Sequence, residues 1–493
     1  MTQATDNSPL YGIANPRSIA TFGASNKFPS MGTGILSSIR QMGYEGRIYP
    51  VHPKESSVLG MPAYTSVLDL PEIPDLALIV LPAHLVPEVF EACGQKGIRH
   101  AIVVSGGFKE VGGDGAALEQ KLKAAARKHG IRFLGPNCIG AVNTHLKFNA
   151  TFLPCEHPPG FIGMASQSGS FITQMFSYLG RHGLGFSTGF SVGNEADIDI
   201  VDCLQYLATC PNTRVIALYI ETIRRGRAFI EAARQIVPEK PIVAYYAGGT
   251  EAGRRAGLSH TGALAGEDRV YDGVFRQSGV IRAQSIEELF DFCWCLGTCP
   301  PPEGKRVIIQ THSGGPGAVA ADACARAGLE LPEISRKTKK QLADYVPGTG
   351  SMNNPVDLTF TKKNLDYFVE IPRILKTDEN ADALLLYLMM PSRNIMLAME
   401  NMGVSKEEIQ TETEKFIDEQ TRYLADMMRQ SEKPWVAFSY YSVESRFIRR
   451  LYEAGAPVLP GPNRAANALG ALCSYAALRK KMMASAALPA GAP

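Results

Sequence analysis

The sequence predicts an α/β protein built from three doubly wound domains, each with a mainly parallel sheet. At 493 residues, a size of ~150 residues per domain gives about three domains. Short apolar runs alternate with helical stretches along the chain, which is the pattern of parallel sheets with crossover helices. The same opening also occurs three times, as an apolar strand, a turn of small residues and a helix. These openings read SIATFGAS, FIGMASQSGS and RVIIQTHSGGPG.

The overall composition is ordinary for a soluble globular protein and excludes several classes. The hydrophobic fraction is 45%, the charged fraction 20% and the net charge +2, so nothing favours binding to nucleic acid or to an anionic membrane surface. No apolar run approaches the ~20 residues of a membrane helix. The first residues, MTQATDNSPLYG, lack the features of a signal peptide. We therefore expect a cytoplasmic protein.

Ten cysteines are scattered along the chain, and without a secretion signal they indicate reduced thiols. Cys293, Cys295 and Cys299 form the one cluster. Their spacing matches no common zinc pattern, and no histidine lies nearby in the sequence. Packing in the core on a helix is the favoured interpretation, and we expect no metal site.

The first domain is predicted at residues 11–149. Its first turn, Gly23-Ala24-Ser25, is not a GxGxxG fingerprint, and no acidic residue follows the second strand. Both observations argue against an NAD-dependent dehydrogenase. The second strand ends instead at Pro53 and Lys54. A lysine there suits a nucleotide that carries a phosphate, although a solvated surface lysine is an equally good interpretation.

The second domain, 151–299, and the third, 306–478, each place small polar residues before a helix. Free backbone N–H groups at a helix start suit an anion, above all phosphate. Capping by a single serine is the alternative, but three serines and a glycine favour anion binding. The residues are Ser166, Gln167, Ser168, Gly169, Ser170, Gly314, Gly315 and Gly317. Residues 300–305 are a predicted linker, and residues 479–493 a predicted disordered tail.

The loop from Gly248 to Gly266 contains the most reactive candidate, His260. Six of its nineteen residues are glycine, so we expect a loop that moves or is ordered by a ligand. A neutral imidazole can carry a phosphoryl group, and a carboxylate on its other nitrogen would fix its orientation. Glu221 ends the preceding apolar strand and is the candidate carboxylate. An ordinary polar loop histidine is the minority interpretation.

Several longer motifs together resemble one family, the NDP-forming acyl-CoA synthetases of the succinyl-CoA synthetase superfamily. The motifs are GLSHTGALAG, SQSG, NPRSIATFGAS, GPNCIGAVN, SGGPGAVAADACARAGLEL and NNPVDLT. The chain is most similar to the α subunits of the ADP-forming acetyl-CoA synthetases, over about residues 11–478. The resemblance implies a Rossmann-like CoA-binding domain followed by two flavodoxin-like domains.

The resemblance also implies roles for individual residues. It places His260 on the phosphorylated histidine, Glu221 on the glutamate that positions it, and the two glycine-rich helix starts on phosphate. The implied CoA-binding residues are Gly23, Ala24, Ser25, Pro53, Lys54, Ser105, Gly106, Asn137 and Cys138.

The implied function is that of an acid–CoA ligase, which makes acyl-CoA from a small carboxylic acid, CoA and ATP through an acyl phosphate and a phosphohistidine. Nothing after Leu478 could form an ATP-grasp domain. The resemblance therefore implies a hetero-oligomer with an ATP-grasp β subunit that binds ATP or ADP with Mg²⁺. Four residues depart from the family pattern, namely Tyr246, Gly249, Glu195 and His312. The departures remove positive charge, which motivates the alternative of a non-catalytic CoA-binding or regulatory homologue.

Overall fold

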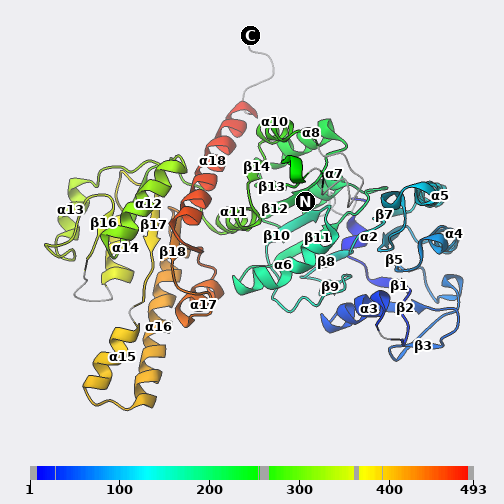
Figure 1. The fold of residues 1–493 in the computed structure, drawn as a ribbon, viewed down its shortest axis with the longest axis horizontal. Helices are drawn as coiled ribbons and strands as arrows, with labels where there is room; N and C mark the ends of the chain where they lie inside the picture. Colours follow the sequence, from blue (N-terminus) through cyan, green and yellow to red (C-terminus); the bar gives the residue numbers. More distant parts are fainter. Residues whose placement is uncertain are drawn as a thin grey trace, which may run out of the picture. The chain divides into compact units, whose positions relative to one another are not determined.

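The computed structural model of the protein describes residues 8–27, 29–253, 255, 266–359, 366–390 and 392–486 (Figure 1). The chain forms two compact units. The first unit consists of Met1–Gly180 and Gly185–Gln284, and the second of Arg181–Leu184 and Ser285–Pro493. Among the described residues, two large sheets and a two-stranded one lie in the first unit, and one large sheet lies in the second.

The first sheet has the order β2-β1-β5-β6-β7, and all its strand pairs are parallel. Its strands are β1 (Ser18–Phe22), β2 (Arg47–Val51), β5 (Leu76–Ile79), β6 (His100–Val103) and β7 (Arg132–Leu134). The helices of this part are α2 (Tyr11–Ala14), α3 (Met31–Gln41), α4 (Val86–Lys96) and α5 (Gly113–His129). The short elements are β3 (Ser57–Val58), β4 (Met61–Pro62), η1 (Val67–Asp69), η2 (Ala83–Leu85) and η3 (Lys109–Val111). The α3 helix begins after Ser30, whose side chain accepts a hydrogen bond from the Thr33 amide, the usual N-cap arrangement.

The second sheet has the order β14-β13-β12-β10-β11-β8-β9. Its strands are β8 (Ala141–Asn143), β9 (Phe148–Asn149), β10 (Ile162–Ser166), β11 (Phe186–Ser191), β12 (Val215–Ile220), β13 (Ile242–Tyr246) and β14 (Ile281–Ala283). Its helices are α6 (Gly169–Arg181), α7 (Ile200–Thr209), α8 (Gly226–Ile236) and α10 (Asp268–Ser278). Strands β8 and β9, which the sequence places in the first domain, join this sheet because β8 pairs antiparallel with β11.

The third sheet, in the second unit, has the order β16-β15-β17-β18-β19 and is parallel throughout. Its strands are β15 (Val307–Thr311), β16 (Val356–Asp357), β17 (Ala383–Tyr387), β18 (Trp435–Ser439) and β19 (Val458–Pro460). The helices of this unit are α11 (Ile286–Thr298), α12 (Gly314–Arg326), α13 (Arg336–Leu342), η4 (Asp366–Glu370), α14 (Ile371–Leu375), α15 (Ser392–Asn401), α16 (Lys406–Arg429), α17 (Arg446–Glu453) and α18 (Pro462–Ala486). Helix α11, which the sequence places in the second domain, belongs to this unit.

The five parallel strands follow the same order in each of the three large sheets. The strand that comes second along the chain lies on one side of the first strand, and the one that comes third lies on the other side. The fold class is therefore three doubly wound α/β domains, as the sequence predicts. In this order the chain reverses its direction of winding between the first and third strands, and ligands bind there, beyond the carboxyl ends. The reversal lies at β1/β5 in the first sheet and at β10/β12 in the second.

The predicted disordered tail is partly wrong. Helix α18 continues to Ala486, through residues 479–486, which the sequence assigned to the tail. Its sequence there, RKKMMASA, is rich in strong helix formers, and this propensity outweighs the low complexity. Residues 487–493 lie outside the described part of the chain.

Cys293 and Cys295 are buried on α11, and Cys299 is partly buried at its end. This confirms core packing for the cluster. Among the described residues, no group of three or more His, Cys, Asp or Glu is arranged to hold a metal ion. None of the described helices has both the length and the apolar character that crossing a membrane requires.

Candidate functional site

A cavity of about 560 Å³ lies in the first unit, where residues from the carboxyl ends of the first and second sheets meet. It is lined from the first sheet by the segments after β5, β6 and β7, and from the second by those after β10, β11 and β12. Nine residues predicted from the sequence line it, namely Ser105, Gly106, Asn137, Cys138, Gln167, Ser168, Gly169, Ser170 and Glu221. The first four of these residues were predicted for CoA, the next four for phosphate, and Glu221 for positioning the phosphohistidine, so the cavity brings these groups together.

On the first-sheet wall, Ser105 connects neighbouring strand ends. Its hydroxyl accepts a hydrogen bond from the Leu81 amide at 3.0 Å, and its carbonyl accepts one from the Asn137 amide at 2.9 Å. The Cys138 thiol donates to the Val103 carbonyl at 3.3 Å. Burial raises the pKa of Cys138 to about 12, so this thiol stays neutral and is a packing group rather than a nucleophile.

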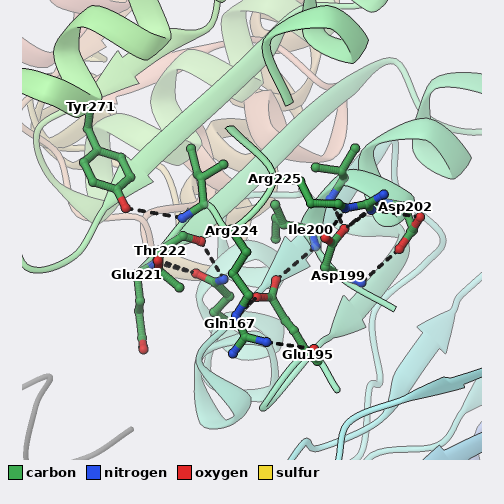
Figure 2. Close-up of polar contacts among 12 residues, drawn as sticks. Gln167, Glu195, Asp199, Ile200, Asp202, Glu221, Thr222, Arg224, Arg225 and Tyr271 are labelled. Atoms are coloured by element: carbon green, nitrogen blue, oxygen red, sulfur yellow. Dashed lines mark hydrogen bonds and ion pairs between the residues drawn. The ribbon is translucent and has the colours of Figure 1, made fainter. Parts of the chain in front are cut away.

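On the second-sheet wall, Gln167 connects the ends of β10 and β12. Its side-chain oxygen accepts hydrogen bonds from the backbone amides of Glu221 at 2.6 Å and Thr222 at 2.9 Å, and its side-chain nitrogen donates to the Thr222 carbonyl at 2.8 Å. Figure 2 shows the Glu221 side chain apart from the paired Glu195 and Arg224. Gln167 therefore holds the backbone from which the Glu221 carboxylate projects.

The small polar turn from Ser166 to Ser170 leads directly into α6. Ser166 is fully buried, and its hydroxyl donates to the Ser168 carbonyl at 2.7 Å. A side chain at Gly169 would meet the Ile139 side chain at 3.0 Å, so the start of α6 lies close to the loop after β7. Ser168, Gly169 and Ser170 line the cavity, and the first amides of a helix have no intrahelical partner.

Glu195 and Arg224 form an ion pair in the cavity wall (Figure 2). Arg224 Nε lies 3.5 Å from Glu195 Oε2, and Arg224 Nη1 donates to the Glu195 carbonyl at 2.8 Å. The other carboxylate oxygen accepts a hydrogen bond from the Ile200 amide at 3.0 Å. Burial raises the pKa of the Glu195 carboxyl to about 7, although Arg224 acts in the opposite direction.

Arg225, next to Arg224, holds the start of α7. Its guanidinium contacts Asp199, and its Nη2 lies 3.0 Å from Asp202 Oδ1. Asp199 and Asp202 form a capping box for α7, which satisfies the first amides of the helix. The pKa of Asp199 is lowered, because the hydrogen bond and charge of Arg225 outweigh its burial. The two arginines thus fix the loop after β12 against the loop after β11.

Asn194 connects the two sheets. Its side-chain nitrogen donates to Glu110 Oε2 at 2.5 Å and to Glu119 Oε2 at 3.2 Å, and its side-chain oxygen accepts from Asn137 at 3.3 Å. At the adjacent Gly193, φ is +54°, and a Cβ would lie 2.3 Å from the Pro136 carbonyl oxygen. Only glycine allows this close approach of the two backbones.

The other predicted CoA-binding residues lie at the ends of β1 and β2. At Gly23, φ is +91°, and a Cβ would lie 1.9 Å from the Val80 carbonyl oxygen. The Ser25 amide donates to Thr33 Oγ1 at 3.0 Å, and Lys54 is exposed. The residues at these positions are Gly23, Ala24, Ser25, Pro53 and Lys54, and they are not among those that line the cavity.

His260 lies within residues 256–265, outside the described part of the chain. The two sides of that segment are near each other, because the Tyr246 hydroxyl donates to the Gly266 carbonyl at 2.9 Å. Ile220 and Tyr246 are register partners in β12 and β13. Glu221 and the segment that begins at Ala247 therefore leave the sheet side by side.

The two departures near this segment have structural explanations. Tyr246 stacks on Tyr271, with ring centroids 3.6 Å apart and an interplanar angle of 13°. A Cβ at Gly249 would lie 2.1 Å from Asp268 Oδ1, and Asp268 is held by Arg282. Tyr246 thus fills its place by stacking, and Gly249 has no room for a Cβ unless Asp268 moves.

The glycines of the third domain lie at the start of α12, in the second unit. Ser313 precedes the helix without a side-chain cap, and a Cβ at Gly314 would lie 3.4 Å from Asp357 Oδ2. Gly315 and Gly317 follow within the first turn. His312 is half-buried, its ring centroid lies 5.3 Å from that of Tyr367, and burial lowers its pKa.

Three cavity residues carry chemistry that the sequence did not single out, namely Arg224, Asn194 and Glu110. Glu195 departs from the family pattern in a way that removes a positive charge. In the structure, however, Arg224 places a cation directly beside Glu195. The pair of adjacent arginines after a buried strand was the available signal. The contacts of these two arginines with the loop after β11 depend on the strand order, which the sequence does not give.

Three family models match the chain. The CoA binding domain matches residues 17–144, the succinyl-CoA ligase like flavodoxin domain residues 159–296, and the ligase-CoA domain residues 307–406.

Some of the curated relatives are separate α subunits, and others are longer proteins. The α subunit of acetate–CoA ligase (ADP-forming) I from Pyrococcus furiosus is 38% identical over 96% of this chain and 99% of its own length. Acetate–CoA ligase (ADP-forming) I from Archaeoglobus fulgidus is 42% identical over 76% of this chain, but only 54% of its own length is matched.

Among solved structures, acetyl-coenzyme A synthetase 1 of Ca. Korarchaeum cryptofilum in complex with phosphate and ADP matches with a TM-score of 0.85 and 32% identity. The match covers 97% of this chain and 99% of that one. The similarity thus extends over the three sheets and over the cavity between the first two. The chain belongs to the ADP-forming acyl-CoA synthetases, the acid–CoA ligase family of these α subunits.

Proposed function

We propose that the chain is the α subunit of an ADP-forming acyl-CoA synthetase, in which a carboxylic acid, CoA and ATP give acyl-CoA, ADP and phosphate reversibly. The shared cavity supports this proposal most strongly, because it joins predicted CoA residues to predicted phosphate residues. In the proposed reaction phosphorylated His260 transfers its phosphoryl group to the carboxylate to form an acyl phosphate, and the CoA thiol then attacks the acyl carbon and displaces inorganic phosphate. Both reactants must therefore enter one space.

Within the cavity, we assign phosphate to the amides at the start of α6, Ser168 to Ser170. These donors are held in place before the reaction and favour an anion. Ser105, Gly106, Asn137 and Cys138 would face CoA, together with the turns at Gly23 and Lys54. The turn at Gly314 in the second unit would be the second phosphate site.

His260 would carry the phosphoryl group, and Glu221 would orient its imidazole. The register of β12 and β13 supports this pairing, because Glu221 leaves the sheet beside the segment that contains His260. The carboxylate would accept a hydrogen bond from one ring nitrogen and thereby leave the other nitrogen unprotonated for phosphate.

The nucleotide would bind to a second subunit of the ATP-grasp class with Mg²⁺, which supplies charge neutralisation for the transferred phosphoryl group. The names of the relatives support a hetero-oligomer, since the similarity to separate α subunits extends over nearly their whole length.

The test is acyl-CoA formation by the chain and its ATP-grasp partner, with a panel of short, long, aromatic and dicarboxylic acids. His260→Ala should abolish turnover. His145→Ala, which changes an exposed histidine bonded to the Gly160 carbonyl, should leave it unchanged. Wild-type turnover by His260→Ala would contradict the proposal.

A non-catalytic CoA-binding homologue is the second candidate, motivated by the departures at Tyr246 and Glu195. It predicts CoA binding without phosphorylation. If labelled ATP, Mg²⁺ and the partner left His260 unmodified in the wild type while CoA still bound, this candidate would replace the first.

A further inference from the structure

The Arg224 guanidinium is a cation in the cavity wall whose main contact is a single buried carboxylate. Arg224 lines the cavity, and its side chain is 41% exposed, whereas that of Glu195 is 2% exposed. Its contacts to Glu195 involve Nε and Nη1. A guanidinium has five N–H donors, so donors on Nη1 and Nη2 remain for an oxyanion in the cavity.

Glu195 is held in a conformation that a glutamate rarely adopts. Its φ is +49°, in the left-handed region, where side chains other than those of Gly, Asn and Asp are uncommon. The Ile200 amide and the Arg224 guanidinium fix its two carboxylate oxygens from different sides. These contacts hold one carboxylate oxygen at the Ile200 amide and the other beside Arg224.

Several other charged or titratable groups lie around the pair. Asp199, the N-cap of α7, raises the pKa of Glu195, and Glu195 in turn raises the pKa of the buried Cys203 thiol on α7. Glu110 reaches the adjacent Asn194 from η3, and Lys109 also lines the cavity. Glu221 lies at the end of β12, the strand that precedes Arg224. Asp199 is paired with Arg225, and among the described residues Glu195 is the carboxylate that forms an ion pair with Arg224.

We propose that Arg224 binds an oxyanion in this cavity and that Glu195 controls the affinity, with tighter binding when Glu195 is protonated. Glu195 is a positioning residue, since it acts through Arg224. The inference deepens the proposed function and rests on it, because phosphate and the carboxylic acid are both oxyanions of that reaction.

The sign of the pH dependence follows from the charges. With the pKa of Glu195 raised to about 7, the carboxyl is neutral below that pH and Arg224 keeps its full charge for the ligand. Above it, the carboxylate neutralises Arg224 and repels the anion. A bound anion raises the pKa of Glu195 further, so affinity falls as the pH rises through about 7 and then levels off.

The experiment measures sulfate binding to the full-length chain alone by calorimetry, from about pH 6 to about pH 8.5. Sulfate stays doubly charged over this range, whereas phosphate itself titrates near pH 7. Wild-type affinity should fall roughly tenfold, which corresponds to a change of about one unit in the pKa of Glu195 on binding. Glu195→Gln keeps the shape and should bind with the tight, low-pH affinity at every pH.

Arg224→Met should bind sulfate weakly at every pH. Arg224→Lys keeps a charge and provides a second test if the methionine variant does not fold. Glu119→Gln is the matched control, because Glu119 is a buried carboxylate that also contacts Asn194 but does not line the cavity. It should keep the wild-type pH profile.

A repeat with acetate, which stays singly charged over the same range, distinguishes the two oxyanions. The same pH profile with acetate assigns Arg224 to the substrate carboxylate, and a profile seen with sulfate alone assigns it to phosphate. A flat wild-type profile, or an unchanged slope in Glu195→Gln, would overturn the inference. Neither measurement requires turnover, so an active complex with flat sulfate binding would remove this inference and leave the proposed function intact.

Discussion

At the scale of single residues, the environment of a side chain decides its chemistry more than its identity does. Cys138 and Glu195 both line the cavity, and burial raises the pKa of each. For the thiol, this removes reactivity at neutral pH. For the carboxyl, it moves titration to about pH 7, where a change in protonation alters the charge of the site.

The buried Glu195 carboxyl should lower the stability of the protein at high pH. Its pKa rises from 4.5 in the unfolded chain to about 7 in the folded one. The folded state therefore holds the proton more tightly, and stability is lost as the pH rises through this interval. Glu195→Gln should remove that loss, on the order of 3 kcal/mol.

Thermal melting of wild type and Glu195→Gln at about pH 5 and about pH 8.5 tests this effect. We expect similar melting temperatures at low pH and a higher one for the variant at high pH. A variant that is less stable at both pH values would show that the ionised form is the one the fold requires.

At the scale of elements, the sequence predicted the strand–turn–helix openings and the segments that form the cavity. Periodicity and small-residue turns are local signals, so β10, α6, β15 and α12 lie where they were expected. The pairing of β8 with β11 and the grouping of α11 with the third sheet depend on contacts between residues far apart in the sequence. No local pattern encodes them, and for the same reason the partner of Arg224 was not predictable.

The approach of the two backbones at Gly193 should be sensitive to one methyl group. Gly193→Ala places a Cβ 2.3 Å from the Pro136 carbonyl oxygen at a positive φ. Gly60→Ala is the control, since φ there is +79° but nothing lies within 4 Å. We expect about 1 kcal/mol of destabilisation for the control, from φ alone, and clearly more for Gly193→Ala.

Chemical denaturation of the two variants measures the difference, and CoA binding shows whether the cavity is disturbed. Equal destabilisation of Gly193→Ala and Gly60→Ala would mean that the backbones at Gly193 and Pro136 can move apart at no cost in free energy. The contact between the first two sheets would then not be a rigid part of the site.

At the scale of the whole molecule, the chain consists of two compact units, and the cavity lies entirely within the first. The second unit contains its own buried ion pair, in which Arg464 on α18 binds Asp291 on α11 through two hydrogen bonds of 2.7 Å. Burial raises the pKa of Asp291, against the effect of Arg464. Loss of the arginine would leave an uncompensated buried carboxylate.

Arg464→Met should therefore destabilise the second unit by about 3 kcal/mol or more and leave CoA binding to the first unit unchanged. Arg326→Met is the control. It breaks an exposed pair with Asp322 on α12, and such pairs contribute about 0.5 kcal/mol. Hydrogen exchange resolves the two units separately. Equal loss of protection in both units would contradict this prediction.

We expect this chain alone to bind the acyl group, CoA and the phosphoryl group in one cavity. Incubation of the isolated chain with labelled inorganic phosphate and a panel of acyl-CoA thioesters, without nucleotide or partner, tests it most directly. We expect acid-labile label on the peptide that contains His260 for at least one thioester, and no label in His260→Ala. Label on another residue, or no label with any thioester, would contradict it.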